Sequence, residues 1–277
     1  MPELPEVETV VRALRPVLAG KTIQRLELLH PRVSRDSDAE RLIAATRNAR
    51  ITHLDRRGKH LLWHLDGRPT LVVHLRMSGQ LLLSDKPLDS PHVRAVFHLK
   101  GGPLVHFVDI RTFGTLFLLD GTEPKGYRDL GVEPLSDSFS PVTLRELMHH
   151  RTTPVKSFLL MQNFVAGIGN IYASEALWLA GIHPRTEAGA IREPKITRLH
   201  DALVKVLSDA VDQMGTTLSD FRRPNGEPGQ YGNQLNVYDR EGQPCPRCGQ
   251  PITRIMQHGR STFFCSRCQH TPRRSRG

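Results

Sequence analysis

The sequence predicts an α+β protein, and three changes of pattern along the chain support this fold class. An amphipathic segment opens the chain, short β-rich runs follow between Thr22 and Leu119, and helical periodicity takes over from Leu144. A cysteine-rich module then closes the chain. With 277 residues, the chain is long enough for two compact domains of ordinary size.

The N-terminal half is predicted to hold one helix and many strands. Apolar residues recur at three- and four-residue steps over Pro5–Leu18, and Gly20 can end that helix. Turn residues separate the β-rich runs, and many strands at short spacing indicate an antiparallel sandwich or barrel. The predicted strands are Ile51–Asp55, Leu61–Leu65, Thr70–Leu75, Gln80–Leu83, Ala95–Leu99, Leu104–Val108 and Thr115–Leu119.

The C-terminal half is predicted to be helical, after a linker at residues 120–141 that is rich in Gly, Pro, Asp and Ser. The predicted helices are Lys156–Val165, Ile171–Ala180 with Asn170 as N-cap and Gly181 as terminator, and Pro194–Met214. Residues 215–233 are rich in glycine and proline, which predicts irregular structure.

The charge of the chain favours a polyanionic partner. Lys and Arg total 38 against 28 acidic residues, which gives a net charge of +10. Residues 241–277 contain seven arginines and one acid, Glu241, so more than half of the excess lies in the last 37 residues. No apolar run approaches the ~20 residues that cross a bilayer, and the acidic, proline-containing start is no signal peptide. We therefore expect a cytoplasmic protein that binds nucleic acid rather than membrane.

The four cysteines predict one structural zinc ion. Cys245-x2-Cys248 and Cys265-x2-Cys268 are separated by sixteen residues, which is the spacing of a four-thiolate zinc site. A redox or disulfide use of the same thiols is the alternative. The intervening segments Ile252–Met256 and Ser261–Phe264 predict a β-hairpin with Arg260 at its tip. Arg260 can contact phosphate there, or be a solvated turn residue.

The N-terminus offers a second chemical feature. Removal of Met1 would leave Pro2 with a free secondary amine, and α-amino groups have a pKa of about 7.7–8.0. Such an amine can attack C1′ of a nucleotide and form an iminium, while Glu3 and Glu6 are close enough in sequence to transfer protons. Proline and glutamate also suit the first turn of any helix, and on these residues alone that structural interpretation is preferred.

A family resemblance reverses this preference. The opening Met1–Thr9 resembles the start of bacterial formamidopyrimidine-DNA glycosylases, and further matches follow in the family's order along nearly the whole chain. These matches are Arg57–Lys59, His74–Gly79, Asp109–Gly114, Gly167–Glu175 and the terminal zinc finger. The related endonuclease VIII family usually has Gly where Leu4 stands here.

The resemblance implies a fold with a β-sandwich, a helix–two-turn–helix and a zinc hairpin. It implies domains at 1–133, 134–235 (with a lesion-capping loop at 215–233) and 236–277, and DNA in a basic cleft between the two halves. The implied activity is removal of 8-oxoguanine or formamidopyrimidines from damaged double-stranded DNA, followed by β,δ-elimination at the abasic site. The implied enzyme is a monomer in the bacterial cytoplasm, associated with the nucleoid.

The resemblance also implies catalytic roles for individual residues. Pro2 is the implied Schiff-base nucleophile, Glu3 its acid–base partner, and Glu6 a support for the same site. Lys59 is implied to act in β-elimination and to hold phosphate, and Arg260 to hold the phosphate beside the lesion. The structural alternative for Lys59 is a solvated surface charge.

The resemblance further implies DNA contacts. Met77, Arg111 and Phe113 match residues that fill the gap left by a flipped base, where apolar contact and a donor to cytosine are useful. Asn170 matches a phosphate contact at a helix start, and further DNA contacts are implied for His92, Lys156, Arg151 and Thr152.

Each of these DNA contacts has a structural alternative. Met77 and Phe113 can be core residues, Asn170 a helix cap, and Arg111, Lys156 and Arg151 solvated charges. His74, between apolar neighbours, is predicted to be a structural histidine, and His92 has the same alternative.

The sequence departs from the family pattern at Ile110 and Thr112, where Pro and Arg are common, and at Ser219, where many relatives carry Lys. These departures leave the lesion preference open. Residues 272–277 are predicted to be a nonspecific basic arm. A noncatalytic zinc-dependent DNA-binding protein remains the rival function, although such a protein would not need the terminal amine.

Overall fold

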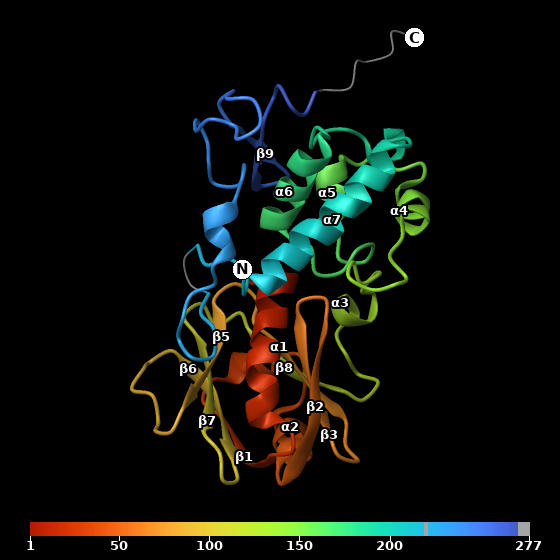
Figure 1. The fold of residues 1–277 in the computed structure, drawn as a ribbon. Coiled ribbons are helices and arrows are strands. Elements are labelled where there is room, and N and C mark those ends of the chain that lie inside the picture. The colour runs from red at the N-terminus through yellow and green to blue at the C-terminus, as the bar shows by residue number, and fades with distance from the viewer. Residues whose placement is uncertain (219–220, 271–277) are drawn as a thin grey trace. The chain divides into compact units, whose positions relative to one another are not determined.

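The structure, a computed structural model, describes residues 1–218 and 221–270 (Figure 1). Ser219 and the predicted basic arm at 272–277 lie outside these described residues. The chain forms two compact units. Unit 1 consists of residues 1–128 and 211–232, and unit 2 consists of residues 129–210 and 233–277. The predicted domain boundaries at 133 and 235 stay predictions.

The helices and strands of unit 1 agree with an N-terminal helix followed by a β-rich segment. They are α1 (Leu4–Leu18), β1 (Thr22–Leu28), a 3-10 helix η1 (Pro31–Ser34), α2 (Ala39–Thr46), β2 (Ala49–Arg57), β3 (His60–Leu65), β4 (Thr70–His74), β5 (Gly79–Ser84), β6 (Val93–Leu99), β7 (Leu104–Asp109), β8 (Thr115–Leu119) and α3 (Lys125–Arg128). All seven predicted strands are present. The elements β1, η1, α2 and α3 were not predicted.

The strands of unit 1 form a two-layered antiparallel sandwich. Their order is β5-β7-β6-β1-β2-β3-β4-β8, and β1 joins β2 through only two residue pairs, Thr22–Arg50 and Ile23–Ala49. The chain can therefore fold over at this short connection, so that β5, β7, β6 and β1 lie opposite β2, β3, β4 and β8 (Figure 1). This confirms the sandwich rather than the barrel.

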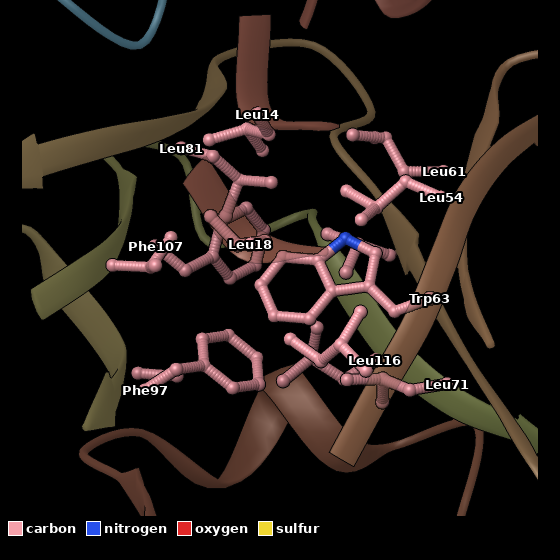
Figure 2. Packing of buried hydrophobic residues seen from close by; sticks show 14 of the residues in the cluster. Leu14, Leu18, Leu54, Leu61, Trp63, Leu71, Leu81, Phe97, Phe107 and Leu116 are labelled. Carbon is pink, nitrogen blue, oxygen red and sulfur yellow. The ribbon is translucent and has the colours of Figure 1, made fainter. Parts of the chain in front are cut away.

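The core of unit 1 fills the space between the two layers. Figure 2 shows Phe97 and Phe107 of one layer facing Trp63 of the other, with Leu14 and Leu18 of α1 packed beside them. The rings of Trp63 and Phe97 lie 4.7 Å apart, and both side chains are fully buried. Burial of apolar surface stabilises by about 25 cal/mol per Å², so this packing holds the C-terminal part of α1 in the core of unit 1.

The helices of unit 2 are followed by one hairpin, as predicted. The elements from residue 129 onward are α4 (Pro141–Met148), α5 (Val155–Leu159), α6 (Asn170–Ala180), a 3-10 helix η2 (Ala188–Ala190), α7 (Lys195–Asp212), a 3-10 helix η3 (Tyr231–Gln234), β9 (Thr253–Gln257) and β10 (Arg260–Phe264). The last two residues of α7 and the first two of η3 belong to unit 1. No helix among the described residues is long and apolar enough to cross a membrane.

The predicted helix Lys156–Val165 is wrong beyond Leu159. The backbone of the following segment pairs with residues 131–132 instead, because Val132 donates to the carbonyl of Phe164 at 3.0 Å and Ala166 donates to that of Val132 at 2.9 Å. The side chain of Gln162 also bonds to the carbonyls of Leu160 and Ile168. These partners replace those of a helix.

Two smaller predictions concern helix ends. Asn170 is not the N-cap of α6, because Gly169 occupies that position and Asn170 is the first helical residue. Gly181 does end α6 in the left-handed conformation, with φ of 69°, as predicted. The predicted linker at 120–141 contains α3 and the boundary between the two units.

Candidate active site and nucleic-acid interface

Pro2, Glu3 and Glu6 are buried together at the start of α1. Glu3 is 3% exposed and Glu6 is 1% exposed, which is unusual for carboxylates. The two form a capping box: the side chain of Glu3 accepts from the backbone of Glu6, and Glu6 Oε2 accepts from the Glu3 amide at 2.7 Å. The helix start therefore holds two carboxylates next to the residue that carries the candidate nucleophile.

The second oxygen of Glu6 binds the segment that follows α7. The amide of Thr216 donates to Glu6 Oε1 at 2.7 Å, and Thr216 is 3% exposed. Gly215 precedes it with φ of 76°, and an added Cβ would lie 3.0 Å from Glu6 Oε1. Only glycine satisfies both the positive φ and the close approach. Glu6 thus joins the N-terminus to the first residues of the predicted lesion-capping loop.

Lys59 lies in the two-residue turn between β2 and β3. Gly58 takes a positive φ of 56° there, and Arg56 donates to the Gly58 carbonyl at 3.0 Å. Arg56 also forms an ion pair with Glu8 of α1 at 3.2 Å, which tethers the turn to the helix that follows Pro2. Lys59 is only 7% exposed, so the interpretation of a solvated surface charge is wrong.

Asp109 organises the two loops that carry the candidate wedge residues. Its carboxylate is 1% exposed and accepts from the Ser78 hydroxyl at 2.5 Å, the Arg111 amide at 3.1 Å and the Gly114 amide at 2.7 Å. Ser78 belongs to the loop between β4 and β5, and the two amides belong to the loop between β7 and β8. One buried carboxylate therefore fixes both loops.

Met77 and Phe113 project from these loops with 40% of each residue exposed. The interpretation of both as core residues is therefore wrong, and Arg111 is exposed with its guanidinium 5.4 Å from the Phe113 ring centre. Thr112, which lies between Arg111 and Phe113 in the sequence, takes a φ of 56°, an unfavourable conformation for a β-branched residue. Arg35, which the sequence did not single out, donates to the carbonyls of Thr112 and Phe113 and supports this conformation.

His92 and His74 occupy different environments in unit 1. The carbonyl of His92 accepts from the Asp109 amide at 2.9 Å, and its partly exposed ring lies 3.4 Å from Arg94. His74 is buried and stacks on His60 with ring centres 4.1 Å apart. Burial lowers the pKa of His60 from 6.5 to about 3 and that of His74 well below its ordinary value, so both rings are neutral. His74 is therefore a structural histidine, as predicted.

In unit 2, Lys156 and Asn170 bind the same carbonyl of β10. Lys156 is 1% exposed, and its Nζ donates to the Ser261 carbonyl at 3.0 Å and to Thr262 Oγ1 at 2.7 Å. Asn170 Nδ2 donates to the Ser261 carbonyl at 2.9 Å. The interpretation of Lys156 as a solvated charge is wrong, because its ammonium holds the hairpin against α5. A DNA contact for either residue stays a prediction.

The hairpin presents Arg260 at the edge of a groove. His258 and Gly259 form a two-residue turn with positive φ at both positions, which matches the twist of the strands, and Arg260 begins β10 with its side chain exposed. The groove, of about 370 Å³, is lined by residues of α5 and of the hairpin, including Lys156 and Arg260. The exposed guanidinium of Arg260 at this edge suits contact with a phosphate.

Arg151 and Thr152 precede α5 and are both exposed. The guanidinium of Arg151 lies 4.5 Å from the ring centre of Phe164. Both side chains are therefore accessible to a ligand, and one face of Arg151 is already held by an aromatic ring.

The four cysteine sulfurs converge as a zinc site requires. Cys245 Sγ lies 3.9 Å from that of Cys268, and Cys248 Sγ lies 3.5 Å from that of Cys265. Zinc–sulfur bonds of about 2.3 Å at tetrahedral angles give sulfur separations of about 3.8 Å. These separations are too long for disulfide bonds, and all four thiols are free. The geometry thus favours zinc over the disulfide alternative.

The electrostatics of the four thiols also call for a cation. Burial and the neighbouring thiols raise the pKa of Cys268 to about 12, and burial raises that of Cys265. Burial also acts to raise the pKa of Cys245, but hydrogen bonds, led by the one from Trp178, lower it to about 6. Four adjacent thiolates repel one another, and one divalent ion neutralises that repulsion. Cys245, Cys248, Cys265 and Cys268 would hold this ion.

Glu175 is a further buried residue for which no role was predicted. It is 1% exposed, and its carboxylate accepts from the amides of Asn236, Val237 and Tyr238 at 2.9 Å each. This carboxylate fixes the segment that leads into the zinc finger. Its position inside the predicted motif Gly167–Glu175 was a signal, but a helical glutamate is usually a surface residue.

Comparison with family models covers most of the chain. The formamidopyrimidine-DNA glycosylase N-terminal domain matches residues 1–116, and the H2TH domain of the same enzymes matches residues 130–222. A zinc finger found in FPG and IleRS matches residues 242–271.

Individual relatives are similar over nearly their full length. A formamidopyrimidine-DNA glycosylase of Chloroflexus aggregans is 47% identical over 97% of this chain and 98% of its own. One from Moorella thermoacetica is 47% identical over 92% of this chain and 94% of its own.

Solved structures are similar to the same extent. The MutM (FPG) protein of Thermus thermophilus gives a TM-score of 0.88 at 41% identity, covering 97% of this chain and 98% of its own. The Lactococcus lactis Fpg in complex with DNA that contains an abasic site gives a TM-score of 0.88 at 34% identity, and the match covers 97% of this chain and 100% of its own.

Proposed function

We infer that this chain, which belongs to the formamidopyrimidine-DNA glycosylase family, removes oxidised purines from duplex DNA with Pro2 as its nucleophile. It is a base-excision repair enzyme, a DNA glycosylase with lyase activity, and one structural zinc ion shapes its finger. We place it on the bacterial nucleoid, in the cytoplasm, and expect a monomer. The substrate bases are 8-oxoguanine and formamidopyrimidines.

The observation that carries the nucleophile assignment is the burial of two carboxylates beside Pro2. Burying a carboxylate is unfavourable unless it is hydrogen-bonded, and a helix cap alone would function equally well on the surface. Glu3 and Glu6 are both almost fully buried and are held by backbone amides. This arrangement favours an enzyme over the rival, a noncatalytic DNA-binding protein.

The reaction proceeds through a covalent bond to the N-terminus. After removal of Met1, the Pro2 nitrogen attacks C1′, the bond from C1′ to the base breaks, and the base leaves after protonation. The sugar ring then opens as the C1′–O4′ bond breaks and O4′ takes a proton, which leaves an iminium between C1′ and Pro2. The iminium acidifies the C2′ proton, and Glu3 exchanges protons at the sugar. Loss of that proton breaks the C3′–O bond, and a second elimination breaks the C5′–O bond. Lys59 assists the first elimination, and water finally releases Pro2.

The remaining site residues bind DNA in this proposal. The phosphate-binding side of unit 2 is provided by Arg260, Arg151, Thr152, Lys156 and Asn170. Among these, Lys156 acts by holding the hairpin. In unit 1, Met77 and Phe113 fill the gap left by the extruded nucleotide, and Arg111 binds the orphaned base, while His92 contacts the backbone.

Borohydride trapping tests this function. Reduction should freeze an adduct between the enzyme and DNA that carries an abasic site, and peptide mapping should locate it at residue 2. Pro2→Gly should impair both base removal and strand cutting, and a chain with an N-terminal extension should be nearly inactive. An adduct at a lysine, or DNA binding without any adduct, would assign the nucleophile or the function elsewhere.

A further inference from the structure

Arg35 binds the backbone of the loop between β7 and β8, which carries Arg111 and Phe113. It directly follows the 3-10 helix η1, and its amide donates to the Arg32 carbonyl at 3.4 Å. Its guanidinium reaches a segment 77 residues away, where Nη1 donates to the Thr112 carbonyl at 3.4 Å and Nη2 donates to the Phe113 carbonyl. The planar fork of the guanidinium thus binds two successive carbonyls of one loop.

The loop needs such support because its backbone is strained at Thr112. That residue has φ of 56°, in the left-handed region that a β-branched side chain rarely adopts. Strained conformations of this kind persist only where surrounding contacts fix them, and they are frequent at functional sites. Loss of one of those contacts should therefore let the loop relax toward an ordinary conformation.

The contacts that fix Thr112 come from two groups of opposite charge. The carboxylate of Asp109 accepts from the amides of Arg111 and Gly114, at 3.1 and 2.7 Å, so it holds donors of the loop. Arg35 holds acceptors, the carbonyls of Thr112 and of the residue after it. All four bonds involve an ionised group, which makes them stronger than bonds between neutral groups. Without Arg35, only the donor side of the loop would be held by a charged group.

The residue after Arg35 reaches the loop between β4 and β5, but more weakly. Asp36 Oδ2 lies 4.0 Å from Nη2 of Arg76, which precedes Met77 in that loop. The Arg76 side chain is 43% exposed, and Asp36 Oδ2 has no hydrogen-bond partner among the described residues. Ion pairs at such a separation and exposure contribute little. The effect of this segment should therefore come through Arg35.

From this geometry we propose that Arg35 is a positioning residue for base extrusion, because it fixes the loop that carries Arg111 and Phe113. The inference rests on the proposed function, in which Phe113 fills the gap left by the extruded nucleotide and Arg111 binds the orphaned base. Both side chains are exposed, so the backbone of the loop rather than burial in a core sets their direction. Arg35 acts through this backbone and needs no contact with the reacting atoms.

Two single-turnover rates, measured in one salt condition, test the proposal. They are removal of 8-oxoguanine opposite cytosine and cutting at a ready-made abasic site. Arg35→Gln should lower the ratio of the first rate to the second about tenfold, the lower end of what hydrogen bonds to a charged group contribute. It should also narrow the preference for cytosine over adenine opposite the lesion, because Arg111 loses its fixed position. Abasic-site cutting should stay unchanged, which shows that the variant is folded.

Two further variants separate positioning from charge. Arg35→Lys keeps the charge but replaces the planar fork by a point charge, so its rate ratio should remain below that of the unaltered chain. Full recovery of the ratio in Arg35→Lys would assign Arg35 to phosphate attraction instead. Arg32→Gln is the matched control, because it removes the same charge from η1, and the exposed Arg32 side chain makes no hydrogen bond to a described residue. It should leave the ratio unchanged.

Phe113→Ala is the reference that distinguishes a failure of this proposal from a failure of the proposed function. If Phe113→Ala lowers the ratio and Arg35→Gln does not, the role of Phe113 stands and Arg35 is not a positioning residue. If Phe113→Ala leaves the ratio unchanged, that role fails, and the proposal for Arg35 fails with it. The double variant should lose less than the product of the two single losses, because residues that act through one loop are coupled. A loss equal to the product would also overturn the proposal.

Discussion

Gly215→Ala should destabilise unit 1 more than an equivalent change elsewhere, because the methyl group would meet Glu6. Gly215 has φ of 76°, and its added Cβ would lie 3.0 Å from Glu6 Oε1, 3.1 Å from Cγ and 3.2 Å from Cα. The left-handed conformation alone costs a residue with a Cβ about 1–2 kcal/mol. Displacing the Glu6 carboxylate also weakens its bond from the Thr216 amide, and hydrogen bonds to charged groups are worth about 1.5–3 kcal/mol.

Gly20→Ala is the matched control. Gly20 also belongs to unit 1, its φ is 81°, and no atom lies within 4 Å of an added Cβ. It should lose only the conformational contribution of about 1–2 kcal/mol. The difference between the two variants, about 1.5–3 kcal/mol, therefore measures the contact with Glu6.

Urea unfolding of both variants gives the difference in the free energy of unfolding. Hydrogen exchange gives a local measurement, since the Thr216 amide should exchange about 10- to 150-fold faster in Gly215→Ala than in Gly20→Ala. Base removal should slow in Gly215→Ala as Glu6 shifts. Equal free energies of unfolding and unchanged exchange at Thr216 would show that Glu6 does not hold this segment.

Three further predictions follow from the site. Phe113→Ala should slow removal of 8-oxoguanine opposite cytosine more than cutting at an abasic site, because only the first reaction needs an extruded base. The control Ile110→Ala, at a neighbouring residue that is 55% exposed, should change neither rate. Equal slowing of both reactions by Phe113→Ala would contradict the wedge role. Cys248→Ser or chelation should abolish DNA binding, because the hairpin has little core of its own, and unchanged affinity in a gel-shift assay would rule this out. Folding lowers the pKa of His60 to about 3, so below pH 6.5 the unfolded chain binds more protons than the folded chain. The free energy of unfolding should therefore fall by about 2 kcal/mol from pH 6.5 to pH 5. Urea titrations should show a shallower fall in His60→Gln, and an equal fall would place the titrating group elsewhere.

Much of the fold could be predicted because its signals are local. The apolar spacing in Pro5–Leu18, the alternating strands and the Cys-x2-Cys pairs each lie within a few residues of one another. The predictions that failed depended on distant partners. Lys156–Val165 has a helical pattern, but its later residues pair with residues 131–132, and no local pattern reveals that pairing.

The same distinction applies to the candidate site. The sequence by itself determined the four zinc ligands, the proline behind Met1 and the exposed arginine of the hairpin, because each is fixed by spacing or position. Only the tertiary structure decided that Lys156 is buried against β10, that Glu6 binds the Thr216 amide 210 residues away, and that Arg35 binds the loop of Phe113. The physical reason is that burial and hydrogen bonding depend on residues that the folding chain brings together from distant positions.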